Sequence, residues 1–215
     1  MDDAFSTHGR LSDTTSEYNR LAFVVRSIMA QQATTTLVIV RAVDGDQVNV
    51  QPMVSQLDGS GNSFEHGVIH GLPVWRLQGG DSAVIVKPAV GDIGLAVFAS
   101  TDISNVKRAK EPTTPGSFRR FDWSDGIYLG GLLNAEPTQF IRMDADGIVI
   151  KSPRPVTIES EGVVTIDATE TTMTGNLTVD GSITTGAGST LDGISFDNHM
   201  HSGVTTGSGQ TGGPV

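Results

Sequence analysis

The chain has 215 residues, enough for one large or two small domains, and it carries a formal net charge of −10 and no cysteine. The acidic balance argues against nonspecific binding to nucleic acid, because such binding needs a basic surface that neutralises phosphates. The lack of cysteine excludes disulfides and catalysis by a thiol. No apolar stretch approaches the ~18 residues of a membrane span, and the acidic first residues do not resemble a secretory signal, so we expect a protein that is soluble as made.

The N-terminal part predicts a polar arm followed by a helix. Residues 1–14 are polar and show no periodicity, which is typical of a mobile segment. From residue 15 to 31, apolar side chains recur at helical spacing, at Tyr18, Leu21, Ala22, Val25, Ile28 and Met29. Thr14 with Glu17 matches a capping box. We expect an amphipathic helix that covers the open end of a small barrel.

The following region, up to residue 106, has the pattern of short strands. Alternating or continuous apolar runs lie at residues 36–43, 48–52, 67–74, 83–86 and 93–98. Asp44-Gly45 between the first two runs is a strong hairpin turn. Five strands in so short a segment favour a closed barrel of the OB type, and closure removes exposed strand edges. Residues 15–106 are therefore predicted to form one domain, a helix with an OB-fold barrel.

Residues 107–125 form a linker with a basic surface. Five of the fourteen basic residues lie here, at Lys107, Arg108, Lys110, Arg119 and Arg120, mixed with Pro112, Pro115 and Gly116. The segment can be interpreted in two ways, as a surface that docks onto an acidic partner or as a solvated loop.

Residues 126–196 carry an internal repeat. Pairs of β-branched residues recur with a step of eight residues, at Ile148/Ile150, Val156/Ile158 and Val164/Ile166. Repeated short strands with turn residues between them are typical of a β-helix, in which each strand stacks on its neighbours. Eight residues are too few for a full coil made by one chain, so we expect three chains to wind together into an intertwined trimeric β-helix. A flat sheet or a disordered polar repeat is the competing interpretation.

His199 and His201 lie in the last segment, residues 197–215, which is rich in Gly, Ser and Thr. In an extended strand both imidazoles point to the same side. One chain supplies two ligands, and three chains supply six nitrogens, which suits an octahedral first-row metal such as iron better than four-coordinate zinc. Only Val204 and Val215 offer apolar bulk after the pair, so a bound metal would contribute folding energy to this tip.

These residues also resemble a known family. Residues 197–204 and 211–214 are similar to the apex of central spike proteins of contractile-tailed bacteriophages, the baseplate assembly protein V group, which has relatives in Mu-like phages and pyocins. Residues 90–104 resemble the end of that family's OB-fold domain, and residues 112–117 and 119–122 resemble its linker. The resemblance covers about residues 34–215.

The resemblance implies a homotrimeric needle that caps the tail tube, joins the baseplate hub, and pierces the host outer membrane when the sheath contracts. It implies one iron ion per trimer, held octahedrally by His199 and His201 of three chains, with Met200, Ser202 and Gly203 at the apex surface. Calcium and chloride occur in some relatives, but no residue here matches those sites. The protein would be made in the host cytoplasm and would reside at the baseplate tip of the virion, without a nucleic-acid partner.

No motif predicts an enzyme. There is no P-loop and no nucleophile elbow. His66 and His70 have the spacing of a zinc-binding helix, but Gly67 and Gly71 break such a helix, so they are interpreted as loop or strand histidines. The segment 144–147 begins like a calcium loop but lacks the remaining ligands, which favours a simple turn.

Two structural alternatives remain open. The chain could be a trimeric tail fibre or adhesin tip that binds host surface glycans, although Phe196 is the single aromatic residue near the tip. It could also be a plug used only for assembly of the tube.

Overall fold

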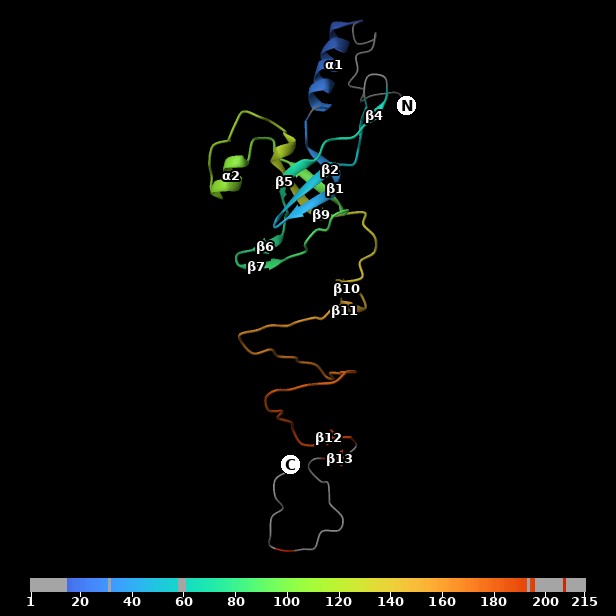
Figure 1. Ribbon diagram of the computed structural model, residues 1–215, viewed down its shortest axis with the longest axis vertical. Coiled ribbons are helices and arrows are strands. Elements are labelled where there is room, and N and C mark those ends of the chain that lie inside the picture. Colours follow the sequence, from blue (N-terminus) through green and yellow to red (C-terminus); the bar gives the residue numbers. More distant parts are fainter. Residues whose placement is uncertain (1–14, 31, 58–60, 193, 196–206, 208–215) are drawn as a thin grey trace. The chain divides into compact units, whose positions relative to one another are not determined.

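A computed structural model describes residues 15–30, 32–57, 61–192, 194–195 and 207. The chain divides into two compact units, residues 1–155 and 156–215. The described residues are mainly β, with one longer helix near the N-terminus (Figure 1). The predicted arm at residues 1–14 and all but one residue of the predicted apex, residues 197–215, lie outside the described residues.

Helix α1 (Glu17–Ala30) confirms the helix predicted over residues 15–31. At its start the backbone N–H of Asn19 donates to the Ser16 hydroxyl at 3.1 Å, which satisfies one of the free amides of the first turn. No residue of α1 is buried. The prediction that this helix covers the open end of the barrel is therefore wrong for the described residues, because a covering helix would bury its apolar face.

Five strands of the first unit form one antiparallel sheet, in the order β5-β2-β1-β8-β9. Their bounds are β1 (Thr35–Asp44), β2 (Gln47–Pro52), β5 (Ile69–Pro73), β8 (Ile93–Phe98) and β9 (Gly126–Gly131). The sheet curls into a half-barrel, so that its two edge strands meet: Val74 forms a parallel bridge with Tyr128, and Trp75 N donates to Tyr128 O at 2.8 Å. Each backbone group paired at this meeting point is one fewer exposed at the sheet edge.

The core lies inside the curl of this sheet. Alternate residues of each strand face it, as the two-residue period of a strand requires. The buried apolar residues are Ala33, Val38, Val40, Val48, Val50, Leu72, Ala96, Phe98 and Tyr128. Gly94 makes room for Tyr128, because a Cβ atom at this position would collide with the Tyr128 ring and with the carbonyl of Gly130. Burial raises the pKa of the Tyr128 phenol above its ordinary value.

The strands predicted at residues 36–43, 48–52, 67–74 and 93–98 are confirmed as β1, β2, β5 and β8. The prediction of a barrel strand at residues 83–86 is wrong. There, β7 (Ser82–Val84) pairs with β6 (Leu77–Gly79) in a separate hairpin. The fifth strand of the sheet is instead β9, whose residues had been expected to open the C-terminal rod.

The remaining elements are short. β3 (Gln56–Leu57) pairs with β4 (Ser63–Phe64), β10 (Phe140–Asp144) with β11 (Gly147–Lys151), and β12 (Thr190–Leu191) with β13 (Ile194–Ser195). Helix α2 (Ser104–Ala109) and the 3-10 turn η2 (Trp123–Asp125) lie between β8 and β9 in the chain. Among the described residues, no helix has the length and apolar character that a membrane crossing requires.

Candidate functional site

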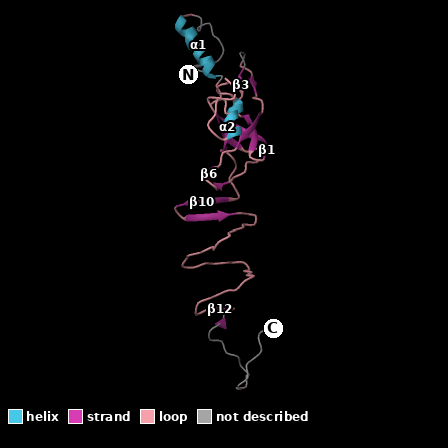
Figure 2. Ribbon diagram, turned by 90° about the vertical axis from the view of Figure 1, so that its left-hand side faces the viewer, coloured by secondary structure: helices cyan, strands magenta, loops and turns pink. Residues whose placement is uncertain are grey.

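The repeat segment, residues 156–189, has little secondary structure and exposes its apolar side chains. It runs back and forth in extended stretches without helix or strand (Figures 1 and 2). Its hydrogen bonds are local ones, such as that from Gly162 N to Ser160 Oγ at 3.1 Å. The apolar residues of the repeat are exposed: Val156 by 63%, Ile158 by 78%, Val164 by 56% and Ile166 by 70%. An extended chain with exposed apolar side chains lacks both the ladder bonds and the core that stabilise strands.

The β10–β11 hairpin pairs its two strands but also exposes apolar side chains. Ile141 lies opposite Ile150, and Met143 lies opposite Ile148, so these four side chains share one face of the hairpin. All four are more than half exposed. The turn between the strands is made by residues 144–147, where Asp146 N donates to Asp144 Oδ1 at 3.0 Å. This confirms the interpretation of that segment as a turn.

Arg119 and Asp125 of the predicted linker form an ion cluster with Asp102, which lies just before the linker; we call it the Arg119 cluster. The two carboxylates are buried, with exposed fractions of 4% and 1%. Arg119 donates from Nε to Asp125 Oδ2 at 2.9 Å and from Nη2 to Asp125 Oδ1 at 3.1 Å, and the same Nη2 lies 2.9 Å from Asp102 Oδ1. Asp125 Oδ1 also accepts from Ile103 N at 3.0 Å. Two carboxylates far apart in the chain therefore hold the two ends of the linker together.

The groups around the Arg119 cluster set its protonation. Hydrogen bonds from Ser104 and Ser117, with the charge of Arg119, lower the pKa of Asp102 from 3.8 to about 2. Ser117 Oγ donates to Asp102 Oδ2 at 2.7 Å. Lys107 Nζ donates to Ser124 O at 2.9 Å, and burial lowers its pKa. Two of the five basic linker residues thus stabilise the loop itself, which leaves the exposed Arg108, Lys110 and Arg120 for any docking role.

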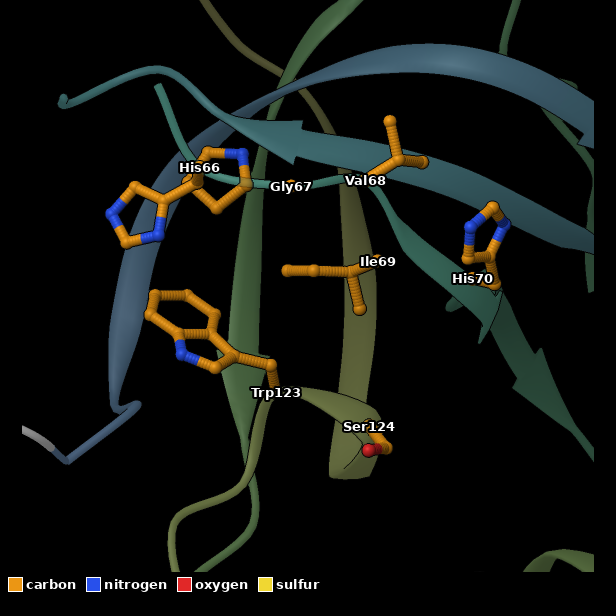
Figure 3. A pocket seen from close by; sticks show the side chains of 8 residues that line it. His66, Gly67, Val68, Ile69, His70, Trp123 and Ser124 are labelled. Carbon is orange, nitrogen blue, oxygen red and sulfur yellow. The ribbon is translucent and has the colours of Figure 1, made fainter. Parts of the chain in front are cut away.

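A pocket of about 470 Å³ lies beside this loop. It is lined by Pro52, His66, Gly67, Val68, Ile69, His70, Trp123 and Ser124. The His66 and Trp123 rings contact each other, with their centroids 5.1 Å apart, whereas His70 lies on the other side of Ile69 (Figure 3). His70 lies in β5 and His66 in the loop before it, which confirms the interpretation of strand and loop histidines.

The predicted metal ligands His199 and His201, with Met200, Ser202 and Gly203, lie outside the described residues. The described chain reaches the start of this segment as the β12–β13 hairpin, where Thr190 pairs with Ser195 and Leu191 with Ile194. Across the part of the chain that the structure describes, no group of three or more His, Cys, Asp or Glu residues could hold a metal ion.

Comparison with known families decides what this segment is. Residues 193–215 match the model of the GpV apex motif. Over this segment, the match supports the resemblance to the baseplate assembly protein V group. No curated protein matches the chain.

Sequence reasoning missed the Arg119 cluster. Arg119 was interpreted as one of the linker charges, and Asp102 and Asp125 were not considered with it. One signal was present: Asp102 followed by Ser104, and Asp122 by Ser124, are aspartates that can accept from a backbone amide two residues on, as both do here at 2.8 Å.

Proposed function

We propose that this protein is the central spike of a contractile phage tail, a homotrimeric needle that caps the tail tube and pierces the host outer membrane when the sheath contracts. The observation that carries the proposal is the match of residues 193–215 to the apex motif, which follows a segment whose apolar repeat stays exposed among the described residues. A narrow needle whose core forms only between chains gives such a segment a function.

The trimer is supported by the unpaired extended stretches of residues 156–189. A single chain that leaves more than half of Val156, Ile158, Val164 and Ile166 exposed gains little hydrophobic stabilisation from them. Three chains wound about one axis would bury one side of every strand and pair both of its edges. The turn residues that lie between the apolar pairs would then mark the corners of the prism. The exposed apolar face of the β10–β11 hairpin fits the entrance to the same rod.

The first unit is proposed to be an OB-fold barrel that attaches the spike to the baseplate hub. Its strand order is β5-β2-β1-β8-β9, and the parallel bridge from Val74 to Tyr128 joins the two edges. A five-stranded Greek-key barrel with a partly open seam has this arrangement. The Arg119 cluster then fixes the long connection that leads into the last barrel strand.

The apex is proposed to hold one iron ion per trimer through His199 and His201 of each chain. The donor set fits the metal, because six neutral imidazole nitrogens suit an octahedral first-row ion. When bound, the metal would crosslink three short tails that have too few apolar residues to form a core of their own. Its role would be structural, and no chemistry on the membrane is required of it.

Two measurements on the full chain test this proposal. Light scattering should give a trimer, and elemental analysis of that trimer should give about one iron per three chains. The double variant His199→Ala/His201→Ala should lose the iron. The matched control is His66→Ala/His70→Ala, which removes two histidines from the pocket of the first unit and should retain it.

Three results would overturn parts of the proposal. A monomer in light scattering would refute the needle as a whole. Iron retained by the apex double variant would refute the metal site but not the trimer. Binding of host glycans by a trimer without metal at its tip would favour the tail fibre.

A further inference from the structure

Helix α1 carries an exposed apolar stripe. Tyr18, Leu21, Val25 and Ile28 are exposed by 79%, 64%, 48% and 56%. Phe23 and Ser27, on another side of the same helix, are half-buried. The stripe is therefore a distinct surface, and the described residues of this chain leave it open to solvent. Exposed apolar stripes of this length on a helix mark a contact with another element.

The spacing of this stripe is that of a coiled coil. The steps from Tyr18 to Leu21, Val25 and Ile28 are three, four and three residues, which places the four side chains at successive a and d positions of two heptads. Val24 and Met29 then take the g and e positions beside the stripe and are also exposed. Apolar residues at e and g widen the seam beyond the two-residue ridge of a pair of helices. The pattern favours a bundle of more than two helices.

The charges of α1 lie away from this stripe. Arg20 and Arg26 take the c and b positions, so both guanidinium groups face outward when the a and d positions meet. Glu17 is the single charge at a flanking position. Parallel copies of α1 can therefore approach each other without bringing like charges into the seam.

The connection between α1 and the sheet orients such copies. Ala33, three residues after the end of the helix, is buried in the core of the sheet, and its N–H donates to Phe121 O at 2.9 Å. Three residues span at most ~10 Å, so the C-terminal end of each helix stays close to its own barrel. Three barrels arranged around one axis would therefore present three helices in the same direction and in the same register.

We propose that α1 forms a parallel three-stranded coiled coil with α1 of the two other chains of the same trimer. The inference rests on the trimer proposed above. Two heptads are too short to associate stably as free helices. Linked to an existing trimer, however, they meet at a high effective concentration.

Cysteine crosslinking of the full chain tests the proposal, because the chain has no cysteine of its own. Leu21→Cys places a thiol at a d position, and Arg20→Cys places one on the adjacent residue at the outward c position. Under a mild oxidant, Leu21→Cys should give covalent dimers that contain roughly two of every three chains, since one thiol of each trimer has no partner left. Arg20→Cys should remain free of crosslinks. A second pair, Val25→Cys and Arg26→Cys, should repeat this difference at an a and a b position.

Light scattering on the same samples separates the possible failures. A trimer in which both members of each pair crosslink equally, or in which neither does, overturns the coiled coil and leaves the spike in place; the stripe would then face another protein. Monomers would overturn the trimer and the coiled coil with it.

Discussion

Val164→Asp tests how the repeat segment is packed. Val164 is 56% exposed in the single chain, where a surface substitution changes stability within about 0.5 kcal/mol. In the proposed trimer this exposed part becomes buried. Burying a whole valine stabilises by about 2 kcal/mol, so the lost burial is roughly 1 kcal/mol per chain and roughly 3 kcal/mol per trimer. Each carboxylate buried near the axis adds a cost of several kcal/mol, and three of them repel each other. A loss of about 10 kcal/mol or more per trimer is expected.

The matched control is Val163→Asp. Val163 has the same side chain, is 91% exposed, and points to the opposite side of an extended strand. It should therefore face solvent in the trimer, and its substitution should be nearly neutral. Urea unfolding followed by circular dichroism, with light scattering for the oligomeric state, measures both variants. A Val163→Asp trimer less stable than the Val164→Asp trimer, or an unchanged Val164→Asp trimer, would refute the assignment of the even-numbered apolar residues to the core.

Two further predictions concern the first unit. Gly94→Ala should lower its stability to urea by about 1–3 kcal/mol, because the added methyl collides with Tyr128 across the β8–β9 pair, whereas Gly79→Ala, with open space around it, should be close to neutral; equal midpoints would contradict the packing. Asp102 has a pKa of about 2 when folded against 3.8 when free, so its contribution to stability is complete above pH 3.8 and is lost as the pH falls toward 2. Unfolding measured over this range should depend less steeply on pH in Asp102→Asn than in the original chain, and parallel curves would show that the carboxylate does not contribute.

Four of the five sheet strands could be predicted because each carries its own signal. β2 alternates apolar and polar residues after the Asp44-Gly45 turn, and β1 and β8 contain continuous apolar runs of strand length. β9 does not: three of its six residues are glycine, and one, Tyr128, reaches the core. Its strand conformation depends on pairing with β8, 28 residues earlier at the Phe98–Gly126 pair, and such long-range pairing leaves no local pattern.

Residues 83–86 show the opposite error, because they were predicted to form a barrel strand and instead lie partly in the β6–β7 hairpin. Ala83 and Val84 lie in an apolar run of the expected length, but they pair with Gln78 and Leu77 in a local hairpin. The hairpin turn lies at Gly80, whose φ of +55° suits glycine. A local partner reached through a tight turn forms before a distant one, because the cost of closing a loop grows with its length. The apolar content of this segment correctly indicated a strand, but the position of the turn determined that β7 pairs with β6.

The two units of the chain use similar apolar residues and differ in where their partners come from. In the first unit, tight turns such as Asp44-Gly45 return the chain onto itself, so that Val40 pairs with Val50 and both lie in one core. In the repeat segment, an apolar pair recurs every eight residues, yet no stretch pairs with the next one in the same chain. Backbone groups and apolar side chains left in this state are costly in any folded protein, which supports the proposal that their partners come from outside the chain. Every repeat lacks the same backbone pairing and the same apolar burial. Identical chains in register would supply both to every repeat, so copies of this chain are the partners that the repeat favours.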